Sequence, residues 1–178
     1  MRTPPQRVKT QNYYNQISKG YEELYEKEQL KKIELIKNLQ LKGKLLDIGA
    51  GSGISTEPFL EKCECYSLDP AKEFLKKSKA KKVFASAEKI PFGDNCFDNI
   101  ISITASQNFK NLKKAINEIK RVAKKDAVII ISILKTSKKL PELKSLLKDH
   151  VQIERDKDIF FFNKSGIRLY RSSLQKDL

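Results

Sequence analysis

The chain has 178 residues, of which 39% are apolar, and its formal net charge is +14 at pH 7. This composition predicts one folded domain with a sizeable core and excludes an intrinsically disordered chain. The longest apolar run, residues 127–134, is too short for a transmembrane helix, which needs about 20 residues. The first residues also lack the apolar core of a signal peptide, so we expect a cytoplasmic protein without membrane contact.

Lysine carries most of the positive charge, because only six of the 36 basic residues are Arg. A strongly basic surface favours polyanions such as RNA. The lysines are spread along the whole chain, which is equally typical of a compositional bias. The charge therefore indicates either a binding surface or a bias, and both interpretations stay open.

The cysteines and the single histidine do not form a metal-binding pattern. Cys63 and Cys65 alternate on one predicted strand and so share a face, whereas Cys96 stands alone. No second Cys or His pair completes a zinc site. We expect the cysteines to be packing residues, His150 to be a surface residue at a helix end, and the protein to hold no metal.

Residues 1–40 are predicted to form an N-terminal helical cap. The first ten residues are polar, and residues 13–39 have apolar side chains at roughly helical spacing, with a break at Gly20. Gly43 then ends the helical part.

Strands and helices alternate over residues 41–165, the predicted core. Strands are expected at 44–48, 65–68, 82–85, 97–104 and 127–134, and helices at 54–61, 71–82, 111–125 and 141–149. Residues 151–153 and 159–162 are predicted to form a hairpin, and residues 166–178 form a basic tail without an assigned structure. The pattern predicts an α/β fold, namely a Rossmann-like, doubly wound, mostly parallel seven-stranded sheet with an antiparallel C-terminal hairpin strand, all in one compact domain.

Chemically important residues follow the ends of the predicted strands. Asp47 and its glycines follow the first strand, Asp69 the second, Ser86 the third, and Thr104 the fourth. In such sheets the ligand binds at the carboxyl ends of the strands, where the strand order reverses. We therefore expect one pocket to collect these residues.

The glycine turn at residues 49–53 has the spacing G-x-G-x-G. Ile54 stands where a dinucleotide-binding turn would have its third glycine. The carboxylate of Asp47 disfavours a pyrophosphate but suits a cationic ligand, and S-adenosylmethionine carries an ammonium and a sulfonium. Asp69 could accept hydrogen bonds from ribose hydroxyls, although an acid there could also cap the next helix.

Five segments in order resemble the class I S-adenosylmethionine-dependent methyltransferases, and within them the small branch of ubiquinone- and menaquinone-biosynthesis enzymes. The segments are residues 14–21, 45–53, 68–70, 87–98 and 120–126. The resemblance implies S-adenosylmethionine as the cofactor. It also implies a set of cofactor-binding residues: Tyr14, Tyr21, Asp47, Gly49, Ala50, Gly51, Gly53, Asp69, Pro70, Ser86, Ala87, Glu88 and Thr104.

Several positions depart from the pattern of that family. Ser86 stands where the family usually has an acid that binds the adenine amino group, so adenine recognition is expected to rely on the backbone of Ala87 and Glu88. Asp126 and Ala127 replace a pair of glycines. The chain also lacks the N/D-P-P-Y motif, which counts against many enzymes that methylate amino groups of bases or of glutamine.

The cofactor determines the expected mechanism, an in-line displacement in which the protein aligns nucleophile, methyl carbon and sulfur. The candidate acceptor-side residues are Thr104, Ser106, Gln107 and Asn108, and no strong general base is evident. A short chain without an inserted lid and with a basic surface favours a macromolecular acceptor, RNA ahead of protein. Two alternatives remain: a small-molecule, quinone-type methyltransferase, and a cofactor-binding subunit that is non-catalytic or needs an activating partner protein.

Overall fold

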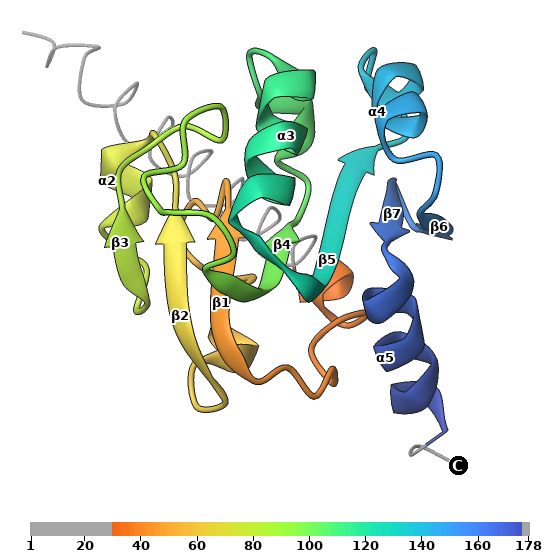
Figure 1. Ribbon diagram of the computed structural model, residues 1–178, viewed down its shortest axis with the longest axis horizontal. Coiled ribbons are helices and arrows are strands. Elements are labelled where there is room, and N and C mark those ends of the chain that lie inside the picture. Colours follow the sequence, from red (N-terminus) through yellow and green to blue (C-terminus); the bar gives the residue numbers. More distant parts are fainter. Residues whose placement is uncertain (1–29, 176–178) are drawn as a thin grey trace, which may run out of the picture.

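The computed structural model describes residues 30–175, and the following observations concern this part of the chain. Its seven strands form one sheet in the order β3-β2-β1-β4-β5-β7-β6, in which β7 runs antiparallel to both neighbours (Figure 1). The remaining paired strands are parallel. The predicted α/β fold is therefore confirmed, and the strand order reverses between β1 and β4.

The strands lie close to the predicted ranges. They are β1 (Gly43–Ile48), β2 (Cys63–Leu68), β3 (Lys81–Val83), β4 (Phe97–Ser102), β5 (Ala123–Leu134), β6 (Val151–Arg155) and β7 (Asp158–Phe162). The largest difference is at β5, which begins four residues earlier than expected because Ala123 already pairs with Phe97. The helix before it therefore ends at Val122 and not at residue 125.

Within residues 30–175, three helices exceed a single turn, namely α3 (Leu112–Val122), α4 (Leu140–Leu146) and α5 (Lys164–Leu174). The last of these occupies residues for which the sequence indicated no structure. Single turns form α2 (Lys72–Leu75), η1 (Glu57–Phe59) and η2 (Ser106–Asn108). No helix between residues 30 and 175 has both the length and the apolar character needed to cross a membrane.

The predicted helix at 54–61 is wrong, since the segment contains only η1 within a series of tight turns. The hydroxyls of Ser55 and Thr56 are drawn inward to Asp47, and Pro58 has no backbone N–H to donate. The chain therefore uses short bonds, such as Phe59 N–H to the Thr56 carbonyl, in place of a regular helix.

The predicted helix at 71–82 is also wrong beyond the single turn of α2. The Ser78 hydroxyl accepts the Ala80 N–H and turns the chain toward β3. Leu75 is buried as expected, but Phe74 is 59% exposed and does not face the core. Sequence spacing could not reveal this, because the turn depends on a side-chain hydrogen bond.

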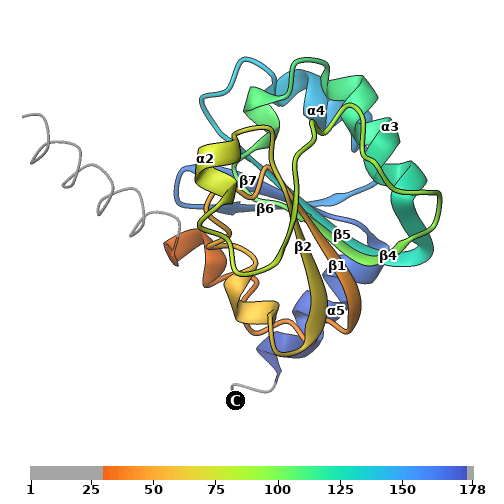
Figure 2. The same ribbon diagram turned by 90° about the vertical axis from the view of Figure 1, so that its left-hand side faces the viewer.

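Apolar layers cover both faces of the sheet (Figure 2). On one face, α3 and α4 pack over alternate residues such as Leu46 and Phe161. On the other face, residues 36–41 and α5 pack over Leu45, Phe160 and their neighbours. Because both faces are covered, polar residues can gather only at the strand ends.

Candidate functional site

The glycine turn follows β1 at the carboxyl edge of the sheet, beside β2. Gly49, Gly51 and Gly53 have φ angles of +72°, +54° and +86°. These angles lie in the left-handed region that favours glycine. The N–H groups of Gly49 and Ala50 donate to the Leu68 carbonyl at 2.8 and 3.1 Å, which binds the turn to the end of β2.

The three glycines have different surroundings. A Cβ atom at Gly49 would lie 2.3 Å from the Ala105 Cβ, and one at Gly53 would lie 2.5 Å from the Ser78 Oγ. A Cβ at Gly51 would meet no atom of residues 30–175 within 4 Å. Gly49 and Gly53 are therefore required by packing, whereas the space beside Gly51 is open to a ligand.

Asp47 lies fully buried beneath the turn. Its Oδ2 accepts the hydroxyls of Ser55 and Thr56, both at 2.6 Å, while its buried Oδ1 has no partner among the described residues. Burial raises the pKa of Asp47 to about 6, even though the two hydroxyls lower it. An unpartnered carboxylate oxygen at this position is suited to a cationic group.

A chain of hydroxyls extends behind Asp47, with 3.0 Å between the Thr56 and Ser67 oxygens and 2.8 Å between those of Ser67 and Ser78. Each hydroxyl has one proton to donate. Since Thr56 donates to Asp47, Ser67 must donate to Thr56, and Ser78 must in turn donate to Ser67. All three hydroxyls are therefore oriented toward the carboxylate and stabilise its ionised form.

Asp69 follows β2 and is also buried. Its Oδ2 accepts the Gly51 N–H at 3.0 Å, and its Oδ1 accepts the Ala71 N–H at 2.7 Å. The Asp69 side chain thus fixes both the glycine turn and the entry to α2. The N-cap residue of α2, Ala71, makes no capping bond through its own side chain. Each carboxylate oxygen retains capacity for a further donor.

The predicted adenine-side residues lie in the loop of residues 84–96, which joins β3 to β4. The Asp69 N–H donates to the Val83 carbonyl, so this loop begins beside the acid. Ala87 is buried, and Glu88 Oε1 accepts the Asn111 N–H at 3.1 Å. The side chains of Ala87 and Glu88 are therefore occupied within the fold, and Pro70, which follows Asp69, is exposed.

The acceptor-side candidates follow β4. Ser106 is fully buried and donates to the Ser132 carbonyl, while Asn108 is exposed. Gln107 donates to the Thr104 carbonyl at 2.6 Å, and its buried Oε1 has no partner among the described residues. Thr104 itself has a φ of +54°, which is an outlier for a β-branched residue.

Two charged residues that the sequence did not indicate meet at Thr104. Lys32 Nζ lies 2.9 Å from Asp158 Oδ2 and donates to Thr104 Oγ1 at 3.1 Å, and Thr104 Oγ1 donates to Asp158 Oδ1 at 3.1 Å. Lys32 is 4% exposed and Asp158 is fully buried. We call these three residues the Lys32 cluster. In the sequence, the one sign of this buried ion pair was the position of Asp158 directly before the apolar residues 159–162.

The structure thus brings Asp47, the glycine turn and Asp69 together, with the 84–96 loop on one side and Thr104 on the other. Tyr14 and Tyr21 lie outside the described residues. Within residues 30–175 no group of three or more His, Cys, Asp or Glu side chains could hold a metal ion.

The cysteines are unpaired, and Cys63 and Cys65 pack together in the core as expected. His150 is half-buried after the end of α4, its Nδ1 has no partner among residues 30–175, and burial lowers its pKa.

Comparison with known proteins agrees with this geometry. Residues 46–131 match the family described as "Methyltransferase domain". An uncharacterised protein of Methanocaldococcus jannaschii is 32% identical over 68% of this chain and 50% of its own length. The demethylmenaquinone methyltransferase of Renibacterium salmoninarum is 30% identical over 50% of this chain and 40% of its own. The chain carries a class I methyltransferase domain.

The domain's fold also resembles solved structures. One is the Haloferax volcanii complex of the Trm112 methyltransferase activator with a methyltransferase, at a TM-score of 0.65 and 14% identity over 78% of this chain and 76% of that one. The chain spans about half the length of the curated relatives it matches.

The cofactor of this family, S-adenosylmethionine, fits the residues present. Asp47 Oδ1 is a buried, unpartnered anion for a cationic group, and the space beside Gly51 is open. Asp69 has unused acceptor capacity for hydroxyls. A dinucleotide would instead place a pyrophosphate near the Asp47 carboxylate, which is unfavourable.

Proposed function

We propose that the protein is an S-adenosylmethionine-dependent methyltransferase. The observation that carries the proposal is the buried Asp47 oxygen, which has no partner in the described part of the chain and lies at the end of β1 beside an open glycine turn. A buried acceptor without a donor is costly, so its retention indicates a ligand. The bound cofactor supplies an activated methyl group. Asp47, Asp69 and the turn bind and orient it so that an acceptor can approach in line.

Isothermal titration calorimetry with S-adenosylhomocysteine tests this proposal. We expect a dissociation constant in the micromolar range. Binding of NADH without any binding of S-adenosylmethionine or S-adenosylhomocysteine would refute it.

For the acceptor, we propose RNA ahead of protein. Three basic side chains, Lys164, Arg168 and Arg171, line a groove of about 410 Å³ along α5. None of the three has an acidic ion-pair partner among residues 30–175. Figure 1 shows α5 at the edge of the sheet opposite the strand ends that hold Asp47. A polymer with regularly spaced phosphates is long enough to contact both places, whereas a metabolite is not.

A small-molecule acceptor is the second candidate. The Lys32 cluster supports it, because a buried ion pair and a strained Thr104 are expensive features that occur mainly at functional sites. The similarity to a demethylmenaquinone methyltransferase points the same way. Labelled cofactor incubated with RNA, protein and small-molecule fractions distinguishes the candidates. Label confined to the small-molecule fraction would exclude RNA.

A partner-dependent role is the third candidate. The edge strand β3 has the exposed aromatic residues Phe74 and Phe84 beside it, at 59% and 52% exposure. Exposed apolar groups next to an unpaired strand edge are typical of a docking surface. The structural similarity to a methyltransferase bound to its activator is consistent with this role. If the purified chain binds cofactor but methylates an isolated acceptor fraction only after a second protein fraction, itself not labelled, is added, a partner is required.

A further inference from the structure

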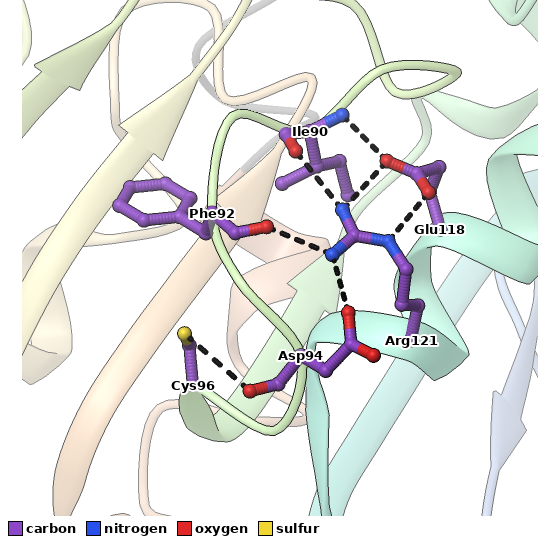
Figure 3. Close-up of polar contacts among 6 residues, drawn as sticks. All are labelled: Ile90, Phe92, Asp94, Cys96, Glu118 and Arg121. Atoms are coloured by element: carbon purple, nitrogen blue, oxygen red, sulfur yellow. Dashed lines mark hydrogen bonds and ion pairs between the residues drawn. The ribbon is translucent and has the colours of Figure 1, made fainter.

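Helix α3 supports the loop of residues 84–96 at two places. This loop has no helix or strand of its own, so its buried peptide groups need other partners. At the start of α3, the Asn111 N–H donates to Glu88. In its last two turns, Glu118 and Arg121 contact Ile90, Phe92 and Asp94 (Figure 3). We call these five residues the Arg121 network.

The Arg121 guanidinium uses all five of its N–H donors within this network. Nε donates to Glu118 Oε1 at 2.7 Å, and Nη2 donates to Glu118 Oε2 at 2.9 Å and to the Ile90 carbonyl at 3.1 Å. Nη1 donates to the Phe92 carbonyl and to Asp94 Oδ1, both at 2.8 Å. Lysine has three donors without a planar arrangement and cannot make the same set of bonds.

Glu118 completes the attachment of the loop, because its Oε2 also accepts the Ile90 N–H at 2.9 Å. Both polar groups of the Ile90 backbone are therefore held by one Glu–Arg pair. Hydrogen bonding to Arg121 lowers the pKa of Glu118 to about 2. The pair consequently stays ionised at every pH used for enzyme assays.

The network lies directly after the residues expected to contact adenine. The Ser86 carbonyl accepts the Lys89 N–H in a tight turn, and Ile90 follows immediately. The backbone of residues 86–88 is therefore part of this turn, and the Arg121 network holds the residues that follow it. As the family resemblance implies, Ser86 stands where the family usually has an acid that binds the adenine amino group, so we expect backbone groups to distinguish the base. Backbone recognition depends on how accurately the loop is positioned.

We propose that Arg121 and Glu118 are positioning residues that hold the backbone of residues 86–88 in place for adenine recognition. This inference rests on the proposed function. It goes further in naming the residues of this chain that position the loop backbone, which act through the loop and do not touch the cofactor.

The test compares two ligands that differ at the base. S-adenosylhomocysteine and its hypoxanthine analogue, S-inosylhomocysteine, are titrated into the wild type, Arg121→Lys and Glu118→Gln by calorimetry below the unfolding temperature. Lys124→Ala is the matched control, because it removes a different ion pair, with Asp98, after the same helix.

We expect Arg121→Lys to bind S-adenosylhomocysteine about tenfold more weakly, while its affinity for the hypoxanthine analogue changes little. The preference for adenine should therefore fall, and Glu118→Gln should change it in the same direction. Lys124→Ala should retain the wild-type preference. If the two residues had a merely structural role, their substitution would weaken the binding of both ligands equally or of neither. Either outcome would overturn the inference. A wild type that binds neither ligand would reject the proposed function itself.

Discussion

Asp47→Asn tests whether the folded protein buries a negative charge at Asp47 that no cation of the described residues neutralises. The folded protein raises the pKa of Asp47 from 3.8 to about 6. Between these values the native state keeps a proton that the unfolded chain has lost, so stability falls as the pH rises through this window. One pKa unit corresponds to about 1.4 kcal/mol, so the native state loses about 3 kcal/mol in all, of which about 2 kcal/mol falls between pH 4 and pH 7. Asparagine has no charge to bury and escapes this loss.

Urea unfolding followed by circular dichroism at pH 4, 5, 6 and 7 measures the effect. We expect the stability of Asp47→Asn relative to the wild type to rise by about 2 kcal/mol from pH 4 to pH 7. Asp98→Asn is the control, because Lys124 and the Lys44 N–H lower the pKa of Asp98. Its difference from the wild type should stay constant above pH 5. If the Asp47→Asn difference were equally flat, the argument about Asp47 would fail.

The same titration should appear in cofactor binding. The ammonium of S-adenosylhomocysteine needs an ionised carboxylate, so below pH 6 binding must first remove the proton from Asp47. We therefore expect the wild-type affinity to rise from pH 5 to pH 7 and the Asp47→Asn affinity to be low throughout. Calorimetry in two buffers of different ionisation enthalpy should detect the released proton in the wild type at pH 5.

Three further predictions concern the turn, the second acid and the buried ion pair. Asp69→Ala removes the acceptor of the Gly51 N–H and should weaken S-adenosylhomocysteine binding at least about tenfold in calorimetry, since such charge-assisted bonds contribute about 1.5–3 kcal/mol; unchanged affinity would count against the site. Gly49→Ala should destabilise the fold by more than 2 kcal/mol in urea unfolding, owing to overlap with the turn after β4 and to backbone strain, whereas Gly51→Ala should cost only about 1–2 kcal/mol yet reduce cofactor affinity; equal losses of stability would contradict this distinction. Lys32→Met should cost about 3–5 kcal/mol because it leaves the Asp158 charge buried alone, and adding Asp158→Asn should recover much of that loss; a double variant no more stable than Lys32→Met would show that the ion pair is not the cause.

The sequence predicted the architecture well because the signals were local. A β-branched apolar run such as residues 127–134 suits only a buried strand, and the alternation of strands and helices restricts the topology to a few arrangements. Two short helical segments were predicted poorly. Residues 54–61 and 71–82 have acceptable helical spacing, but hydroxyl hydrogen bonds between segments redirect their chain.

The sequence by itself determined that a glycine turn preceded by Asp47 follows a buried strand, and that acids and polar residues follow the next strands. Such information is local, because turn geometry and strand burial depend on neighbouring residues. Only the tertiary structure decided that Lys32 and Asp158 meet at Thr104, and that Arg121 holds the loop before β4. These partners lie 27 to 126 residues apart, and no spacing rule relates them. Their contacts exist because the fold brings distant segments together at the ends of the strands, after β4 for the Lys32 cluster and before β4 and β5 for Arg121.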